Sequence, residues 1–133
     1  MNPVLIKRGF LAAGAMNIGG VLLFSRLFTN EAMNQADPVI MSNFGLLSIC
    51  LWGLAYIAVG IQEQVRWPAA VFAVEKLVYV LVWTFWMKHN AGNLETLFAT
   101  DLMAGAFYCV YGLNDILFMV FFALVFWKSP KNV

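Results

Sequence analysis

The chain has 133 residues, of which 62% are hydrophobic and 11% are charged, and its formal net charge is +1. Soluble domains carry charged side chains at about a quarter of their positions, because polar groups must cover the large surface of a small protein. The composition therefore excludes an ordinary soluble domain and a disordered tail, and the small net charge argues against a partner made of nucleic acid. It indicates a single transmembrane domain over residues 1–133 that lies in a lipid bilayer.

Four apolar segments are long enough to cross a bilayer as α-helices, which need about 20 residues for about 30 Å of hydrocarbon. They run from Gly9 to Phe28, from Phe44 to Ile61, from Trp67 to Met87 and from Leu102 to Trp127. Each segment is continuously apolar, whereas the strands of a membrane β-barrel alternate. The sequence therefore predicts an all-α fold, an integral membrane four-helix antiparallel bundle.

Basic residues near the ends of these segments predict the orientation, because Lys and Arg are enriched on the cytoplasmic side. Five of them fall on one side (Lys7, Arg8, Arg66, Lys128 and Lys131) and two on the other (Arg26 and Lys88). The pattern predicts a multi-pass membrane protein with both termini in the cytoplasm and an external loop over residues 29–43. The basic residues are too few for a lipid-headgroup patch, and we interpret them as topology anchors.

The second and fourth segments share a pattern at an offset of 59 residues, because Cys50–Ile57 aligns with Cys109–Ile116. The same offset relates Asn17 of the first segment to Lys76 of the third. The pattern indicates two repeated helical hairpins, although apolar segments also resemble one another by chance.

Polar residues interrupt the apolar segments near their middles. Glu75 and Lys76 do so in the third segment, Asn114 and Asp115 in the fourth, and Asn17 in the first. At about 1.5 Å per helical residue these five residues lie close to one plane. A charge at that depth costs at least about 2.5–3.5 kcal/mol, so these side chains should face the bundle interior and pair. Lys76 with Asp115 is the preferred ion pair.

Two carboxylates against one ammonium leave one negative charge in excess, so one carboxyl group is expected to hold a proton. Glu75 lies about 100° around the helix from Lys76 and is expected to face a different helix or another protomer, which favours it as the proton carrier. Aromatic residues lie at helical spacing from Lys76 and Asp115, among them Tyr79 and Tyr111. The predicted site for a ligand or proton comprises Asn17, Glu75, Lys76, Tyr79, Tyr111, Asn114 and Asp115.

A stripe of small residues on the first segment predicts the surface on which another helix approaches closely. It consists of Gly9, Ala13, Asn17 and Gly20. Gly53 in the second segment and Gly105 with Gly112 in the fourth are expected to have the same role.

The midplane charges are compatible with several functions. The preferred one is binding or translocation of a small solute or proton by a homo-oligomer or a larger membrane complex. The alternatives are a non-catalytic accessory subunit, a protein that binds a lipophilic molecule such as a lipid or quinone, and a purely structural ion pair that locks helix register. No catalytic, cofactor or metal motif is present, and the only histidine is His89.

Several of these residues also carry a resemblance. They are Gly14 and Asn17, the stretch from Trp52 to Tyr56, Lys76, and Gly112 with Asp115. In them the chain resembles the small bacterial four-helix membrane proteins of the DoxX-like and DUF4345-like class. The resemblance implies a four-helix antiparallel bundle in a bacterial inner membrane and no particular reaction.

Overall fold

The structure is a computed structural model that describes residues 1–130. In this range it consists of helices and loops: α1 (Pro3–Phe24), α2 (Glu31–Ala36), α3 (Asn43–Gly60), α4 (Arg66–Asn90), a 3-10 turn (Ala91–Asn93), α5 (Leu94–Thr100) and α6 (Leu102–Lys128). Four of its helical stretches are long and apolar enough to cross a membrane. The predicted all-α fold with four long apolar helices is therefore confirmed. Lys131, which was counted for the orientation, lies outside the described residues.

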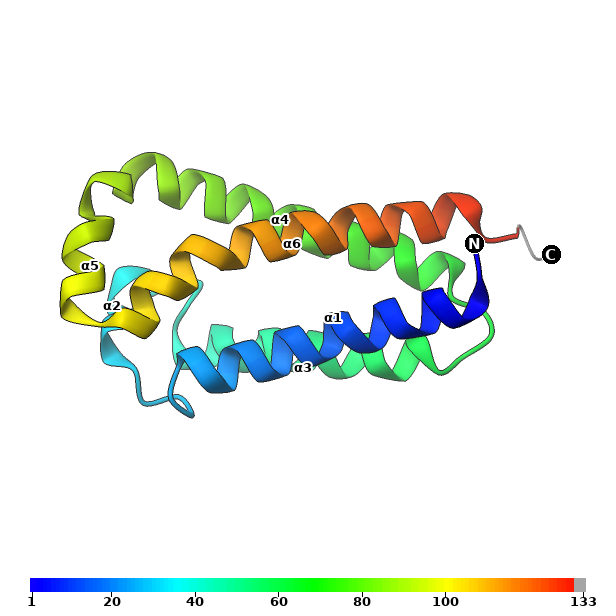
Figure 1. Cartoon of the computed structure of the whole chain (residues 1–133), viewed down its shortest axis with the longest axis horizontal. Helices are drawn as coiled ribbons and strands as arrows, with labels where there is room; N and C mark the ends of the chain where they lie inside the picture. The colour runs from blue at the N-terminus through cyan, green and yellow to red at the C-terminus, as the bar shows by residue number, and fades with distance from the viewer. Residues whose placement is uncertain (131–133) are drawn as a thin grey trace.

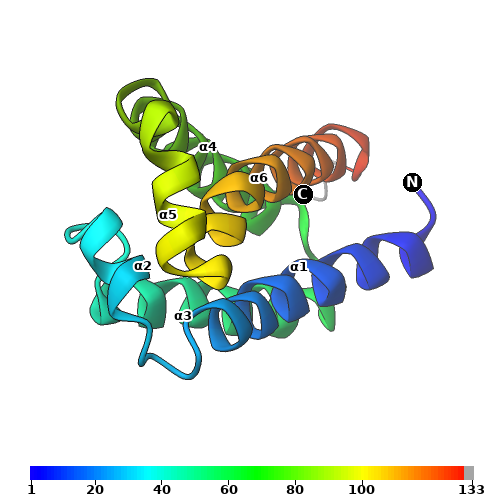
Figure 2. The same ribbon diagram turned by 60° about the vertical axis from the view of Figure 1, so that its left-hand side comes forward.

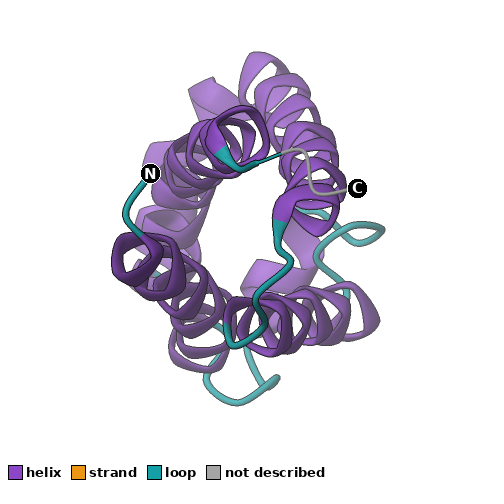
Figure 3. Ribbon diagram, turned by 90° about the vertical axis from the view of Figure 1, so that its right-hand side faces the viewer, coloured by secondary structure: helices purple, strands orange, loops and turns teal. Residues whose placement is uncertain are grey.

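The long helices α1, α3, α4 and α6 lie lengthwise, and each runs opposite to the one before it (Figure 1). Packing is closest within the pairs α1 with α3 and α4 with α6, and the two pairs meet less extensively along α1 and α6. Viewed from the end that carries both termini, the four helices surround a common axis (Figure 3). The short helices α2 and α5 lie at the opposite end (Figure 2).

The first long helix begins and ends earlier than the sequence predicted. It starts at Pro3 because the Asn2 side chain accepts a hydrogen bond from the Val4 amide at 2.8 Å, and proline suits the first helical position. It ends at Phe24 because residues 26–28 turn into the left-handed region, with φ values of 48°, 56° and 66°. Such residues cannot continue a right-handed helix, and hydropathy alone does not reveal them.

The segment expected as an external loop is folded against the bundle. It contains α2, and both Met33 and Met41 are fully buried. The hydroxyl group of Tyr108 on α6 donates to the Met33 carbonyl at 2.8 Å, and the indole of Trp86 on α4 donates to the Ala36 carbonyl at 2.9 Å. These contacts close the end of the bundle that lies away from the termini.

Asp101 connects this end to the start of α6. Its Oδ1 accepts hydrogen bonds from the Ala104 amide at 2.8 Å and from Asn30 Nδ2 at 3.1 Å, and its Oδ2 pairs with Arg26. Burial raises the pKa of Asp101, but the hydrogen bonds from Arg26, Ala104 and Asn30 outweigh this effect, so the pKa lies below its ordinary value.

Replacing Asp101 with alanine is expected to lower the free energy of unfolding by about 1–2 kcal/mol at neutral pH, because α6 loses its N-cap. A carboxylate with a depressed pKa stabilises the fold above its ordinary pKa, and this contribution is lost as the pH falls through the folded-state value. The deficit of D101A should therefore shrink between about pH 7 and about pH 3. Thermal unfolding in detergent, followed by tryptophan fluorescence, measures this. An equal deficit at both pH values would contradict the assigned role.

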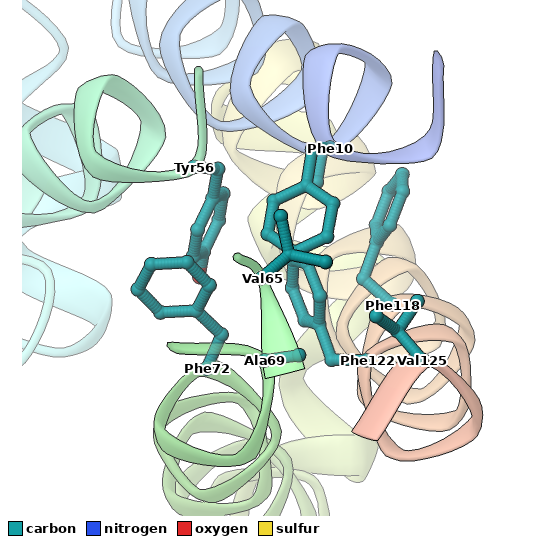
Figure 4. Close-up of a cluster of buried hydrophobic side chains, with 9 residues drawn as sticks. Phe10, Tyr56, Val65, Ala69, Phe72, Phe118, Phe122 and Val125 are labelled. Atoms are coloured by element: carbon teal, nitrogen blue, oxygen red, sulfur yellow. The ribbon is translucent and has the colours of Figure 1, made fainter. Parts of the chain in front are cut away.

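Towards the termini, a core of aromatic rings fills the space between the long helices (Figure 4). Phe10, Tyr56 and Phe122 are fully buried and come from α1, α3 and α6. The ring centroids of Phe10 and Phe122 lie 5.1 Å apart, and those of Tyr56 and Phe72 lie 4.7 Å apart, in edge-to-face arrangements. This core closes the bundle between the midplane and the terminal end.

The predicted stripe of small residues is correct only in part. Gly9 does lie against Phe121 of α6, but a side chain at Gly20 would meet nothing within 4 Å. The closest approach of two backbones is at Gly14 and Gly53, where a Cβ atom on Gly14 would lie 2.7 Å from the Gly53 carbonyl oxygen. Helices α1 and α3 therefore pack backbone to backbone one position away from the predicted stripe.

Candidate functional site

The polar residues near the middles of the long helices surround one cavity of about 60 Å³. All seven residues of the predicted site line it, namely Asn17, Glu75, Lys76, Tyr79, Tyr111, Asn114 and Asp115. The rest of its wall is mostly apolar and includes Met16 of α1 and Val110 of α6. The fold therefore brings the predicted residues together from three helices.

Lys76 and Asp115 form the centre of this site. Lys76 Nζ lies 2.6 Å from Asp115 Oδ1, and the two residues are only 1% and 6% exposed. Lys76 Nζ also donates to Asn17 Oδ1 at 3.0 Å, and Asn17 Nδ2 donates to the Ile49 carbonyl of α3 at 3.1 Å. One chain of hydrogen bonds thus connects all four long helices at the level of the cavity.

The side chain of Glu75 on α4 faces helix α3. The Tyr56 hydroxyl group donates to Glu75 Oε2. The structure therefore shows contact with a neighbouring helix of the chain, and contact with another protomer stays a prediction. The ammonium group of Lys76 also lies 5.4 Å from the centroid of the Tyr56 ring, so Tyr56 contacts both charged residues of α4.

Tyr56 is the residue of this cluster that sequence reasoning missed. It is fully buried, and its ring belongs to the aromatic core while its hydroxyl group reaches the site. The offset of 59 residues could have identified it, because that offset relates Tyr56 to Asp115 as it relates Asn17 to Lys76.

Two buried polar atoms at the cavity have no hydrogen-bond partner among the described residues. They are Glu75 Oε1 and the hydroxyl oxygen of Tyr111, and both residues line the cavity. An unsatisfied buried polar group costs about 1–3 kcal/mol, and a cavity of about 10–15 Å³ already holds one water molecule. The cavity that Glu75 and Tyr111 line is large enough for several water molecules or a small polar solute.

The charges of the site do not balance when all its groups are ionised. Glu75 and Asp115 contribute two negative charges and Lys76 one positive charge, so a bound proton or a cationic group would neutralise the cluster. Asn114 Nδ2 lies 3.3 Å from Asp115 Oδ1 and adds a weak hydrogen bond at the margin of the site. Within residues 1–130 no group of three or more His, Cys, Asp or Glu side chains is placed to hold a metal ion.

Access to the cavity differs by direction. The aromatic core lies on its side towards the termini, and a second buried cluster that includes Phe107, Tyr108 and Met33 lies on its side towards α2. Between α1 and α6, however, the lining residues Met16 and Val110 are 52% and 44% exposed. The wall between these two helices therefore also forms part of the outer surface of the bundle.

Comparison of the chain with family models, curated proteins and solved structures gives no match. The resemblance to the DoxX-like and DUF4345-like class therefore stays an expectation from the residues quoted for it.

Proposed function

We propose that the chain is a multi-pass membrane protein, an antiparallel four-helix bundle whose midplane cavity binds a proton or a small polar solute during transport across the bilayer. Both termini would lie on the cytoplasmic side, as the basic residues predict. The four apolar helices and their alternating directions support this architecture.

The observation that carries the proposal is the pair of unsatisfied buried atoms, Glu75 Oε1 and the Tyr111 hydroxyl, on two residues that line the same cavity as Lys76 and Asp115. An ion pair that served only to lock helix register would be expected to have its polar neighbours satisfied and its surroundings closely packed. Here the residues that line the cavity include two with unsatisfied polar atoms and three charged side chains that do not balance. This combination favours a binding site over a purely structural pair.

Buried clusters lie on both sides of the cavity along the length of the bundle. The exposed part of the wall lies between α1 and α6, at Met16 and Val110. We therefore propose that transport requires a homo-oligomer or a larger complex in which another protein covers this side.

Proton uptake by proteoliposomes tests the proposal. With a membrane potential imposed by a potassium gradient and valinomycin, and a pH-sensitive dye in the lumen, the wild type should acidify the vesicles. D115N and E75Q should lose most of this activity, because each removes an ionisable group of the cluster. E31Q is the matched control, since Glu31 is exposed on α2 at the end of the bundle and does not line the cavity. Uptake by D115N equal to that of the wild type would refute proton transport at this site.

A second candidate, binding of a lipophilic molecule with a polar head, is favoured by one observation. The cavity wall is mostly apolar and is exposed at Met16 and Val110, where lipid would surround the protein. Mass spectrometry of molecules extracted from purified protein tests this candidate. A specific compound that is retained by the wild type and lost from D115N would support it, whereas recovery of bulk lipids alone would argue against it.

A further inference from the structure

A second cavity, of about 760 Å³, lies at the end of the bundle that carries both termini. Figure 3 views the helices from this end. It is lined by the loop between α3 and α4 and by the ends of α1 and α6. Three basic residues from three different helices line it, Lys7, Arg66 and Lys128, against one acidic residue, Glu63. The lining therefore has an excess of two positive charges.

None of these basic residues forms an ion pair within residues 1–130. The ion pairs of that range are Lys76 with Asp115 and Arg26 with Asp101. Arg26, at the opposite end, is thus neutralised by a carboxylate, whereas Arg66 is not. The positive charge of the terminal end remains available to a partner from outside the chain.

The guanidinium group of Arg66 is held in place by its neighbours. Its Nε donates to the Phe126 carbonyl at 3.1 Å, and its Cζ lies 4.5 Å from the centroid of the Phe126 ring and 5.1 Å from that of Trp67. Its two terminal amino groups make no hydrogen bond to any group in residues 1–130. A fixed guanidinium group with free terminal N–H groups suits bidentate binding of a phosphate.

Exposed tryptophans place this cavity near the membrane surface. Trp67 and Trp127 are 66% and 76% exposed at the same end of the bundle, and tryptophan is enriched where the hydrocarbon meets the headgroups. A phosphate at the level of Arg66 would therefore lie in the headgroup layer of the surrounding bilayer.

We propose that this basic cavity binds the phosphate of one anionic lipid headgroup, with Arg66 as the principal contact and Lys7 and Lys128 as supporting charges. From the sequence alone, the basic residues are too few for a lipid-headgroup patch and are interpreted as topology anchors, but a single phosphate needs only the three that the fold gathers in this cavity. The site is separate from the midplane cavity, and no lining residue is shared.

Binding of short-chain lipids to the full chain in an uncharged detergent tests the proposal, with native mass spectrometry as the readout. Dioctanoyl phosphatidylglycerol should bind at least about tenfold more tightly than dioctanoyl phosphatidylcholine. R66Q and K128Q should each weaken phosphatidylglycerol binding by about fivefold or more, as expected for a basic residue near an anionic headgroup. K88Q removes an exposed charge at the opposite end and should leave binding unchanged.

Inorganic phosphate added as a competitor distinguishes a lipid headgroup from a soluble phosphate compound as the occupant of this cavity. Displacement of the lipid by low millimolar phosphate would support the phosphate site and assign it to a soluble phosphate compound. No preference for phosphatidylglycerol over phosphatidylcholine would overturn the proposal. So would wild-type binding by both R66Q and K128Q. Because Lys128 is exposed, K128Q tests the site even if R66Q fails to fold.

Discussion

Replacing Lys76 with methionine is expected to lower the free energy of unfolding by about 3–5 kcal/mol. Methionine nearly matches the length of the lysine stem, but it leaves Asp115 buried without its counter-ion and removes the donor to Asn17. Glu75 would then be a second carboxylate in the same interior without a nearby positive charge. Unfolding of the purified protein by sodium dodecyl sulfate in mixed micelles measures the loss.

The double variant K76M/D115L separates the loss of pairing from the loss of the charges themselves. Replacing both members of a buried ion pair with apolar residues of similar size is often neutral or stabilising, so the double variant should recover most of the stability lost in K76M. A K76M protein as stable as the wild type would show that the ion pair is not buried and paired as described. Recovered stability in K76M/D115L without recovered proton uptake would separate function from folding.

Replacing Gly14 with alanine is expected to destabilise the protein by about 1–3 kcal/mol, the usual cost of overfilling a packed interface. The added Cβ would lie 2.7 Å from the Gly53 carbonyl oxygen and 2.5 Å from Ile57 Cγ1. The carbonyl group belongs to the backbone of α3, so relief requires the two helices to separate. Separation would also weaken the hydrogen bond between Asn17 and the Ile49 carbonyl, one turn further along α1.

Gly19→Ala on the same helix is the matched control, because a side chain there would meet nothing within 4 Å. Alanine is a better helix former than glycine by about 1 kcal/mol, so G19A should be as stable as the wild type or slightly more stable. Thermal unfolding followed by tryptophan fluorescence compares the two variants. A G14A protein that gains stability as G19A does would contradict the close approach of α1 and α3.

The long helices could be predicted from the sequence because their signal is composition over about 20 residues, which does not depend on tertiary contacts. The ends of α1 could not, because they depend on the Asn2 cap and on three left-handed residues after Ser25. Helices α2 and α5 are too short for a hydropathy signal, and α2 is held by contacts from Trp86 and Tyr108, which are distant in sequence.

The charged part of the site could also be predicted, because charges at the depth of Glu75, Lys76 and Asp115 have few acceptable environments in a bilayer. The group that accepts a hydrogen bond from Asn17 could not be predicted, since it is the backbone carbonyl of Ile49 and has no sequence signature. Tyr56 was not predicted as a site residue because tyrosine at helical spacing is typical of an apolar core.

The repeat of 59 residues is consistent with this arrangement. Lys76 donates directly to Asn17, the residue at the equivalent position of the other hairpin, and the equivalent positions Tyr56 and Asp115 both contribute to the same cluster. Whether the two hairpins arose by duplication stays a prediction. The meeting of equivalent positions near a common axis is what an internal two-fold arrangement would produce.

Whether the midplane cavity is a hydrated binding site or a dry, closed ion pair is tested most directly by infrared spectroscopy of the protein in lipid. The wild type should show a protonated carboxyl band that is lost in E75Q, changes in size with pH, and shifts on exchange into D₂O. Such a band would show that Glu75 exchanges protons with water at the cavity. A spectrum without this band, or a band that changes with neither pH nor D₂O, would contradict the proposed site.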